Sequence, residues 1–413
     1  MAKKRNIIVG QSGGPTAVIN SSLAGVYKTA KERGFCKVYG MLHGIQGFMD
    51  EQYIDLSTQI HSDLDIELLK RTPSAFLGSC RFKLPEIHED AEIYEKIFQI
   101  LDKLEIEAFI YIGGNDSMDT IKKLSDYAIV KGHDQKFLGV PKTIDNDLAL
   151  TDHTPGFGSA AKYIATSTKE IIRDALGLTY NDKEAITVLE VMGRNAGWLT
   201  GAAALARTED CEGPDAIYLP EVVFDIDKFL KTTKDLLKKK ESVVIAVSEG
   251  IKLADGRYVC ELSGGADYVD AFGHKQLQGT AAYLAGFLGA ETGCKTRSIE
   301  FSTLQRSASH MASRVDVDEA FMVGGAAVKA ADEGDSGKMV VIDRVSDDPY
   351  QSAAGIYDVH RIANHEKTVP RSWLNEEGNY VTEEFINYIE PLIHGNYEPF
   401  MVNGLPRHLV LKK

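Results

Sequence analysis

The sequence lacks the features that mark membrane-spanning, secreted and metal-cluster proteins. No apolar run approaches the roughly 20 residues that a helix needs to cross a bilayer, and the start, "MAKKRNIIVG", has too short an apolar part for a signal peptide. The five cysteines are odd in number and include no CxxC pair. We therefore expect reduced thiols in a cytoplasmic protein without a metal cluster. No HxxH or HExxH pattern occurs, which argues against protein-bound zinc.

Basic residues are fewer than acidic residues. The chain has 46 basic and 60 acidic residues, which gives a net charge of −14. This balance argues against nucleic acid or an anionic membrane surface as the main partner. An anionic small substrate is still compatible with it, because a pocket can be locally basic. Any phosphate site must then be built from a few well-placed basic residues and from backbone N–H groups.

Length and patterning predict a two-domain α/β protein without a low-complexity linker. The chain has 413 residues, which is too long for one ordinary core. Apolar residues make up 44% of it, enough for a sizeable core. Short apolar runs alternate with helical patterns, which is typical of mostly parallel sheets with helices on both faces. Ligands of such sheets collect at the carboxyl ends of the strands. The predicted strands are "NIIVG", "EAFIYIGG", "KFLGVPKT", "AITVLEVMG", "AIYLPE" and "SVVIAVSEG", and the predicted helices are 15–32, 90–104, 117–131, 156–176 and 225–240.

The first strand runs into a glycine-rich loop, "IIVGQSGGPTAVIN". Gly13 and Gly14 allow the backbone to approach a ligand, and Pro15 suits the first turn of a helix. The N–H groups and the dipole of a helix start attract an anion. The loop matches neither GxxxxGK[ST] nor GxGxxG, so the standard nucleotide motifs are absent. A tight connection without a ligand remains the alternative.

A second glycine loop, "FIYIGGNDSMDT", follows a later strand. Ser117 or Asp116 is placed to cap a helix that begins near Met118, and a cap alone is the structural alternative. Asn115 and Asp116, however, stand where a glycine loop would otherwise favour phosphate. A carboxylate in that position requires a divalent cation or a lysine to compensate it.

The next strand ends in "VPKTIDNDLA". If both loops lie at one edge of the sheet, Lys142 reaches Asp116 and the phosphate, and Asp145 is left to act on a substrate hydroxyl. An aspartate that accepts the hydroxyl proton during phosphoryl transfer is a general base. Asp147 fits a supporting role at the metal. An Asx turn is the alternative for this stretch.

Together these pieces resemble the phosphofructokinase family. The matching elements are "GQSGGPTAVIN", "LGSCRF", "GGNDS", "PKTIDND", "EVMGRNAGW", "VSEG" and "TLQR", which span residues 10 to 306. The resemblance implies two similar Rossmann-like domains with the active site in the cleft between them. We expect a donor domain at 1–155, completed by about 305–365, and a sugar-phosphate domain at 156–304. A C-terminal extension, 366–413, lies largely outside the resemblance.

The resemblance also implies roles for individual residues. Asp145 resembles the catalytic base, with Thr143 and Asp147 as its neighbours in the motif. Gly13 and Arg81 resemble the phosphoryl-donor side. The contacts to the sugar phosphate are expected at Met192, Gly193, Arg194, Glu249, Arg297, Thr303 and Arg306.

The donor implied by the resemblance is pyrophosphate. ATP-using members of the family carry glycine at the positions of Asp116 and Lys142. The Asp116 side chain fills space that the α-phosphate of a nucleotide needs, and its charge repels that phosphate. Lys142 provides a point charge for the leaving phosphate of a compact donor. The resemblance therefore predicts reversible transfer from pyrophosphate to the 1-hydroxyl of fructose 6-phosphate.

Two departures from the family pattern bear on the metal and the sugar. The aspartate usually associated with Mg²⁺ is Asn115 here, and the histidine of the sugar-binding run is Thr303. Mg²⁺ is then expected mainly on the donor, on water, and on Asn115 with Asp145 or Asp147.

Two alternatives remain. One is an ATP-dependent 6-phosphofructokinase that tolerates Asp116 through a shifted nucleotide, and the other, which Asn115 and Thr303 motivate, is a catalytically silent regulatory subunit that binds a sugar phosphate. Because the family shares an arginine between subunits, either Arg297 or Arg306 here, we expect a homodimer or homotetramer.

Overall fold

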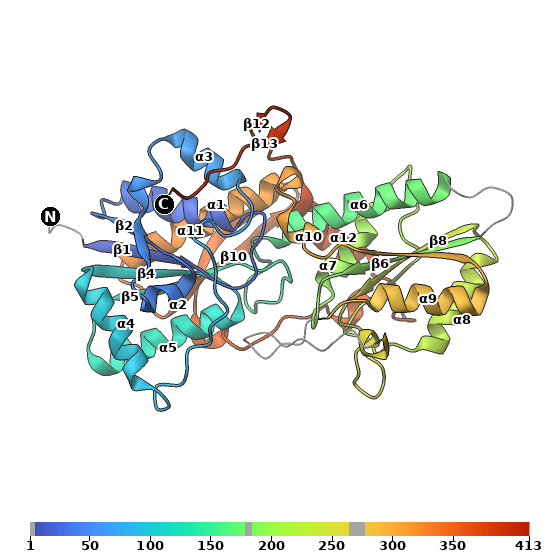
Figure 1. Ribbon diagram of the computed structural model, residues 1–413, viewed down its shortest axis with the longest axis horizontal. Coiled ribbons are helices and arrows are strands. Elements are labelled where there is room, and N and C mark those ends of the chain that lie inside the picture. The colour runs from blue at the N-terminus through green and yellow to red at the C-terminus, as the bar shows by residue number, and fades with distance from the viewer. Residues whose placement is uncertain (1–4, 178–183, 264–276, 413) are drawn as a thin grey trace. The chain divides into compact units, whose positions relative to one another are not determined.

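The computed structural model describes residues 5–177, 184–263 and 277–412, which form two compact units (Figure 1). Unit 1 takes its described residues from Met1–Ser159, Arg306–Glu366 and His394–Lys413. Unit 2 takes its described residues from Ala160–Gln305 and Lys367–Ile393. Within the described ranges, no helix has both the length and the apolar character that crossing a membrane requires.

Unit 1 is built on a seven-stranded sheet with the order β11-β10-β5-β4-β1-β2-β3. The strands from β10 to β2 run parallel to their neighbours, and the edge strands β11 and β3 are antiparallel. The strands are β1 (Asn6–Gln11), β2 (Val38–Met41), β3 (Tyr53–Asp55), β4 (Ile106–Gly113), β5 (Lys136–Pro141), β10 (Lys338–Asp347) and β11 (Tyr350–Asp358). The helices are α1 (Ile19–Glu32), α2 (Gly44–Met49), α3 (Asp63–Arg71), α4 (Ala91–Lys103), α5 (Asn115–Lys131) and α11 (Arg314–Asp332).

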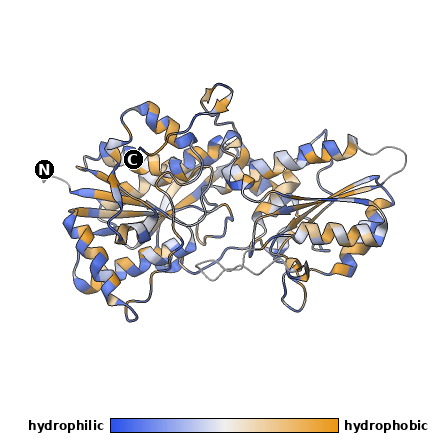
Figure 2. Cartoon of the chain, viewed as in Figure 1, coloured by the Kyte–Doolittle hydropathy of each residue, from blue (hydrophilic) through white to orange (hydrophobic). Residues whose placement is uncertain are grey.

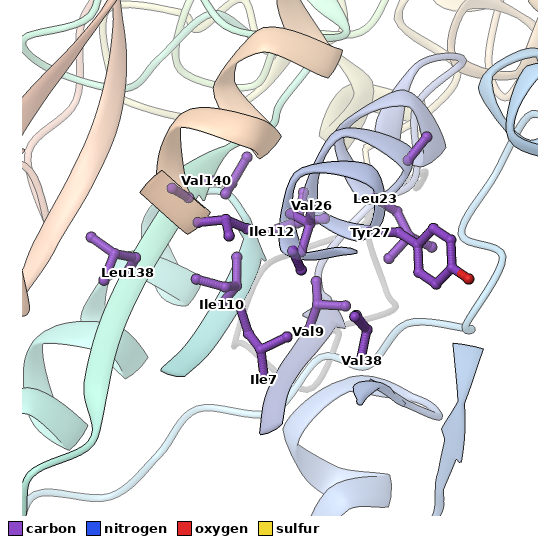
Figure 3. Packing of buried hydrophobic residues seen from close by; sticks show 14 of the residues in the cluster. Ile7, Val9, Leu23, Val26, Tyr27, Val38, Ile110, Ile112, Leu138 and Val140 are labelled. Atoms are coloured by element: carbon purple, nitrogen blue, oxygen red, sulfur yellow. The ribbon is translucent and has the colours of Figure 1, made fainter. Parts of the chain in front are cut away.

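Both faces of this sheet are buried, which explains why its strands are continuous apolar runs. Ile7 and Val9 of β1 pack on one face with Leu23 of α1, as Figure 3 shows. Ile8, between them in sequence, packs on the other face with residues of α4 and α5, such as Phe98. The alternation follows from the two-residue period of a strand. The helices combine hydrophobic and hydrophilic residues, as Figure 2 shows.

Helices α1 and α11 approach each other more closely than side chains would allow. A Cβ at Gly25 would lie 2.1 Å from the carbonyl oxygen of Phe321, and one at Gly324 would lie 2.1 Å from that of Ser22. Glycine is therefore required at both positions. The Ser21 hydroxyl also donates to the carbonyl of Val317 over 2.7 Å. The start of α11 also contacts the segment that follows β5, because Asp316 accepts from the N–H groups of Gly156 and Ser159 over 2.8 Å each.

Unit 2 contains a parallel four-stranded sheet with the order β7-β8-β6-β9. In Figure 1, α6 lies on one face of this sheet and α8 and α9 lie on the other. The strands are β6 (Ala185–Val191), β7 (Ala216–Tyr218), β8 (Ser242–Ser248) and β9 (Lys295–Glu300). The helices are α6 (Phe157–Gly177), whose first residues belong to unit 1, α7 (Trp198–Gly201), α8 (Ile226–Leu237), α9 (Thr280–Thr292) and α12 (Glu383–Ile389). The short elements include α10 (Leu304–Ser307) and the hairpin of β12 (Met401–Val402) and β13 (Leu405–Pro406).

The predicted α/β class with mostly parallel sheets is confirmed, but two predicted helix starts are wrong. Pro15 does not lie in the first turn of a helix, because α1 begins at Ile19. The Thr16 hydroxyl accepts from the N–H of Val18 over 3.2 Å, which keeps this stretch in a loop. Helix α5 begins at Asn115, with Gly114 as its N-cap and no side-chain cap.

A buried polar network holds the loop that follows β5. His153 is 1% exposed, and its ring nitrogens lie 2.8 Å from Asp152 Oδ1 and 2.6 Å from Glu319 Oε2. Arg344 of β10 contacts Asp152 over 3.0 Å, and Tyr350 donates to Glu319 over 2.6 Å. Burial acts to lower the pKa of His153, but the two carboxylates outweigh it and raise that pKa to about 9. His153 is therefore an imidazolium at neutral pH.

We expect Glu319→Gln to destabilise the protein by about 3–5 kcal/mol, because it breaks a buried ion pair. The folded pKa of His153 is raised above its usual 6.5, so the stabilisation is complete below pH 6.5 and is lost as pH rises through about 9. Urea unfolding from pH 6 to 10 measures both effects. Lys103→Met, at the exposed pair with Glu51, is the control and should leave stability unchanged. Equal urea midpoints for wild type and Glu319→Gln at pH 7 would contradict the assignment.

Candidate active site

Three loops follow adjacent parallel strands of unit 1. Strands β5, β4 and β1 are neighbours, with Gly113 opposite Pro141 and Gln11 opposite Ile112. The loops themselves are joined, since Ser12 N–H donates to Ile112 O over 2.9 Å and Lys142 N–H donates to Gly113 O over 3.1 Å. The two glycine loops and the "KTIDND" loop thus meet at the carboxyl edge of the sheet, where ligands of such sheets bind.

The first glycine loop is anchored by the segment that carries Ser79 and Cys80. Gly13 has φ +73°, a conformation that favours glycine, and its N–H donates to Cys80 O over 3.1 Å. The Ser79 hydroxyl donates to Gly13 O over 2.6 Å. This anchor places Arg81, an exposed side chain, beside the loop. In the described part of the chain, no group accepts a hydrogen bond from the Gly14 N–H.

Lys142 is a buried cation, only 2% exposed. Its Nζ donates to Gly14 O over 2.6 Å and lies 3.3 Å from where a Cβ of Gly13 would stand. Burial lowers the pKa of Lys142 to about 8, because the ammonium loses its hydration. Asp145 and Asp147 oppose this shift, whereas nearby Arg306 and Arg81 add to it.

The Lys142 side chain contacts the first glycine loop, and not Asp116 as the sequence predicted. Among the described residues, its ammonium forms no ion pair with Asp116. The two side chains nevertheless belong to adjacent loops of one sheet edge, because the Lys142 N–H donates to Gly113 O.

The loop that carries Asp145 folds back on itself. Asp145 N–H donates to Thr143 Oγ1 over 3.1 Å, which forms a turn of the kind that threonine favours. Thr154 Oγ1 donates to Thr143 O over 2.8 Å, and Thr143 pairs with Gly156 in a parallel bridge. Asp145 and Asp147 are half-buried, and Asn146 between them is buried with φ +53°. This backbone holds the two carboxylates near Lys142.

Asp116 lies in the first turn of α5, where the helix dipole stabilises a carboxylate. A side-chain carboxylate therefore stands at the position where the helix N-terminus would otherwise attract a phosphate. No hydrogen bond from a capping side chain competes with it there, because the N-cap is Gly114. The Asp116 carboxylate therefore occupies a helix N-terminus that favours anions.

Asn115 offers a possible metal ligand at the start of α5. Its Nδ2 donates to His365 O over 3.1 Å, and among the described residues its buried Oδ1 has no hydrogen-bond partner. An amide oxygen with carboxylates on the neighbouring loop suits Mg²⁺, which prefers oxygen ligands. No cluster of three His, Cys, Asp or Glu side chains able to hold a metal occurs in the described ranges. The residues therefore fit a Mg²⁺ that keeps much of its coordination to phosphate and water.

Unit 2 gathers a second group of predicted residues at the carboxyl ends of β6 and β8. Gly193 N–H donates to Glu249 Oε1 over 3.5 Å, and Ser248 Oγ donates to Gly193 O over 2.6 Å. Gly250 packs against Arg194, since a Cβ there would lie 2.0 Å from the Arg194 carbonyl oxygen. Met192, Gly193, Arg194 and Glu249 thus lie together at this edge of the sheet, and their role as sugar contacts stays a prediction.

The other predicted sugar contacts are Arg297, Thr303 and Arg306, and their roles also stay predictions. Arg297 lies on the edge strand β9, opposite Thr187, and contacts Asp174 over 3.3 Å. Thr303 is exposed. Arg306 belongs to unit 1, where its Nη1 lies 3.3 Å from where a Cβ of Gly14 would stand.

Sequence reasoning missed Gln305 and Glu221. The Gln305 Oε1 accepts from Met192 N–H over 3.3 Å, and Glu221 accepts from Gly197 N–H over 2.8 Å. Both side chains support the "MGRNAG" loop from distant parts of the sequence. Both had a signal in the sequence, since Gln305 lies within the quoted "TLQR" and Glu221 ends the predicted strand "AIYLPE".

Comparisons with known proteins agree on one family. The phosphofructokinase family model matches residues 6–331. A curated relative from Xanthomonas campestris pv. campestris (strain B100), named pyrophosphate–fructose 6-phosphate 1-phosphotransferase, is 42% identical over 408 residues, with 98% of this chain and 96% of the relative covered. A relative of the same name from Halomonas elongata is 40% identical, with 99% and 97% covered. The crystal structure of a pyrophosphate-dependent phosphofructokinase from Nitrosospira multiformis aligns with a TM-score of 0.88 and 37% identity, with 99% and 98% covered.

The lowered pKa of Lys142 predicts a pH limit on anion binding. The ammonium is present below about pH 8 and is lost above it, so affinity for methylenediphosphonate with Mg²⁺ should fall by up to tenfold per pH unit above 8. Lys142→Arg stays protonated over this range, which removes the decline that is due to residue 142. Isothermal titration calorimetry of both proteins from pH 7 to 10 measures the difference between their affinities at each pH. The protonation of the ligand affects both proteins equally and therefore cancels in this comparison. Identical pH profiles would contradict the assignment.

Proposed function

Because the chain belongs to the phosphofructokinase family, we propose that it reversibly transfers a phosphoryl group from pyrophosphate to the 1-hydroxyl of fructose 6-phosphate. The products are fructose 1,6-bisphosphate and phosphate. The observation that carries this proposal is the buried ammonium of Lys142, which donates to the first glycine loop, while the neighbouring loop leads into the helix start that holds Asp116.

The choice of donor follows from these two side chains. Lys142 offers one compact positive charge in a dry environment, where its attraction for a phosphoryl oxygen is stronger than in water. Asp116 offers negative charge at the helix start, which opposes a third phosphate and the rest of a nucleotide. A short donor with two phosphoryl groups fits this arrangement better than ATP.

Asp145 acts as the general base. Its carboxylate accepts the proton of the 1-hydroxyl as that oxygen attacks phosphorus, the bond from phosphorus to the bridging oxygen of pyrophosphate breaks, and phosphate leaves. The Lys142 ammonium stabilises the charge on the leaving phosphate. Thr143 orients Asp145 through the hydrogen bond that its hydroxyl accepts from the Asp145 N–H.

The metal is proposed to be Mg²⁺, held by Asn115 and Asp147 together with the donor. The buried Oδ1 of Asn115 and the half-buried Asp147 carboxylate supply oxygen ligands. When bound, the ion neutralises charge on the phosphoryl oxygens. Met192, Gly193, Arg194 and Glu249 of unit 2 bind the sugar phosphate. We place the reaction in the cytoplasm.

Arg297 is proposed to serve a second copy of the chain. Its ladder partner Thr187 precedes Met192 by five residues, roughly 16 Å along a strand. Arg297 is exposed on an edge strand of unit 2, and its contact with Asp174 is also exposed. An arginine in this position is better placed for a partner subunit than for the sugar site of its own chain. The chain is then at least a homodimer.

Replacement of Asp145 tests the reaction. Asp145→Asn removes the base and should lower kcat with pyrophosphate by roughly 10²–10⁴-fold, with little change in either KM.

Replacement of Asp116 tests the choice of donor. Asp116→Gly should permit some transfer from ATP, which we expect wild type not to use. Fructose 1,6-bisphosphate formation with each donor measures both effects. Strong ATP turnover by wild type would refute the choice of donor, and no turnover with either donor would refute the proposed reaction.

Mixing two inactive variants tests the shared arginine. Arg297→Ala and Asp145→Asn are each expected to be nearly inactive. Co-refolded dimers that contain one of each carry one complete site if Arg297 acts on the partner, so activity should return to about a quarter of the wild-type value. An Arg297 that acts within its own chain leaves every mixed site defective, and the mixture stays inactive. Size-exclusion chromatography confirms that mixed dimers form.

A further inference from the structure

The last part of unit 2 packs on Trp198, the residue that directly follows the "MGRNAG" loop in sequence. The indole of Trp198 is 3% exposed and stacks on the ring of Phe385 in α12, with centroids 5.9 Å apart and 14° between the ring planes. Trp373 meets both rings edge-on, at 5.9 Å and 6.3 Å. Tyr388 lies 5.3 Å from each indole. Both tryptophans of the chain therefore belong to one aromatic cluster.

Hydrogen bonds join the end of the loop to the same C-terminal segment. The Trp198 Nε1–H donates to Lys367 O over 3.0 Å. Glu221 Oε1 accepts from the N–H groups of Gly197, over 2.8 Å, and Val369, over 2.9 Å. Hydrogen bonds to a carboxylate are stronger than those between neutral groups. The loop is thus attached to a segment that lies beyond the part of the chain matched by the family model.

The packing behind the loop is too close for added side-chain atoms. A Cβ at Gly201, the last residue of α7, would lie 2.2 Å from Phe385 Cζ, so the ring is in direct contact with the helix backbone. A Cβ at Gly197 would lie 2.7 Å from Glu221 Oε2. Close-packed groups of this kind transmit small displacements to their neighbours. The position of α12 therefore determines the position of α7.

The two ends of the loop are also packed against each other. A Cβ at Gly193 would lie 2.5 Å from Ala196 O, and Ser248 Oγ donates to Gly193 O over 2.6 Å. Arg194 lies between Gly193 and Ala196 in sequence. A shift of α7 at Trp198 is therefore passed to the part of the loop that holds the predicted sugar contacts.

We propose that the C-terminal segment Lys367–Ile393 positions the "MGRNAG" loop, and that Phe385 acts through α7 to set the affinity for the sugar phosphate. This proposal rests on the proposed function, because it takes the loop as part of the site for fructose 6-phosphate. A loop without this support would have to be ordered when the ligand binds, at a cost in affinity. Phe385 contacts Trp198 and Gly201, and so it is a positioning residue.

Two substitutions change the contact of α12 with α7 from opposite sides. Phe385→Leu removes the three ring atoms nearest to Gly201, and Gly201→Ala adds a methyl group that overlaps them. Each should raise the Kd for fructose 6-phosphate about tenfold, because a small displacement of a binding loop is costly. The double variant should bind within about threefold of wild type, because the methyl group then occupies the space of the ring atoms. Isothermal titration calorimetry of the full-length proteins measures each Kd.

Kinetics and a milder variant give further readouts. In the two single variants, KM for fructose 6-phosphate should rise by the same factor as Kd, while kcat stays within about twofold. Trp198→Phe keeps an aromatic ring but loses the hydrogen bond to Lys367 O. It should weaken the binding of fructose 6-phosphate by roughly threefold to tenfold. This variant decides the question if the other substitutions prevent folding, which thermal unfolding establishes.

Leu288→Ala is the matched control. Leu288 is fully buried in α9, and a Cβ at the adjacent Gly289 would lie 3.1 Å from Thr296 Oγ1, near the start of β9. This position is at the opposite edge of the sheet from the loop. The control should lose at least as much thermal stability as Phe385→Leu, because a large side chain is truncated in both. It should bind fructose 6-phosphate as wild type does, and all variants should keep the affinity for methylenediphosphonate with Mg²⁺.

Two results would overturn the proposal. Folded Phe385→Leu, Gly201→Ala and Trp198→Phe proteins that bind fructose 6-phosphate as wild type does would limit the aromatic cluster to a role in stability. An equal loss of affinity in Leu288→Ala would show that any packing defect in unit 2 weakens the site. A wild-type protein without pyrophosphate turnover would refute the proposed reaction, whereas the titration with fructose 6-phosphate would still decide the role of Phe385.

Discussion

The burial of one positive charge organises the candidate site. The Lys142 ammonium is almost inaccessible, and the hydrogen bond it donates to Gly14 O ties the loop after β5 to the loop after β1. A buried cation is costly unless charges or hydrogen bonds compensate it. Asp145 and Asp147 supply part of this compensation, and we propose that the donor supplies the rest. The position of the proposed base and the selection of the donor thus depend on the same ion.

The parallel sheet makes this arrangement possible. Three neighbouring strands bring their loops to one edge, and each loop contributes a different chemical group. These are the Gly14 N–H after β1, Asn115 and Asp116 after β4, and Lys142 with Asp145 after β5. The far end of the last loop is fixed by the buried imidazolium of His153 between two carboxylates. Rigid support outside the loop therefore determines where its reactive residues lie.

The sequence predicted much of this, but only where the signal is local. Apolar runs that end in glycine or proline located the strands, and the loops behind them contain the candidate site residues, because a parallel sheet brings its carboxyl ends together. The start of α1 was predicted four residues early, since nothing local shows that the Thr16 hydroxyl keeps the chain in a loop. The contact of Asn115 with His365 joins residues 250 positions apart, and the placement of Arg306 beside Gly14 joins distant segments as well. Such contacts arise from packing and leave no periodic pattern.

The most direct test of the central claim is a crystal structure of the protein with methylenediphosphonate and Mg²⁺. The account predicts phosphoryl oxygens within about 3 Å of Lys142 Nζ and of the Gly14 N–H, the distance of a charge-assisted hydrogen bond. It also predicts that the Asp116 side chain bounds the donor on the side where a nucleotide would continue. A diphosphonate bound away from Lys142, or a channel past Asp116 wide enough for an adenosine group, would contradict the account.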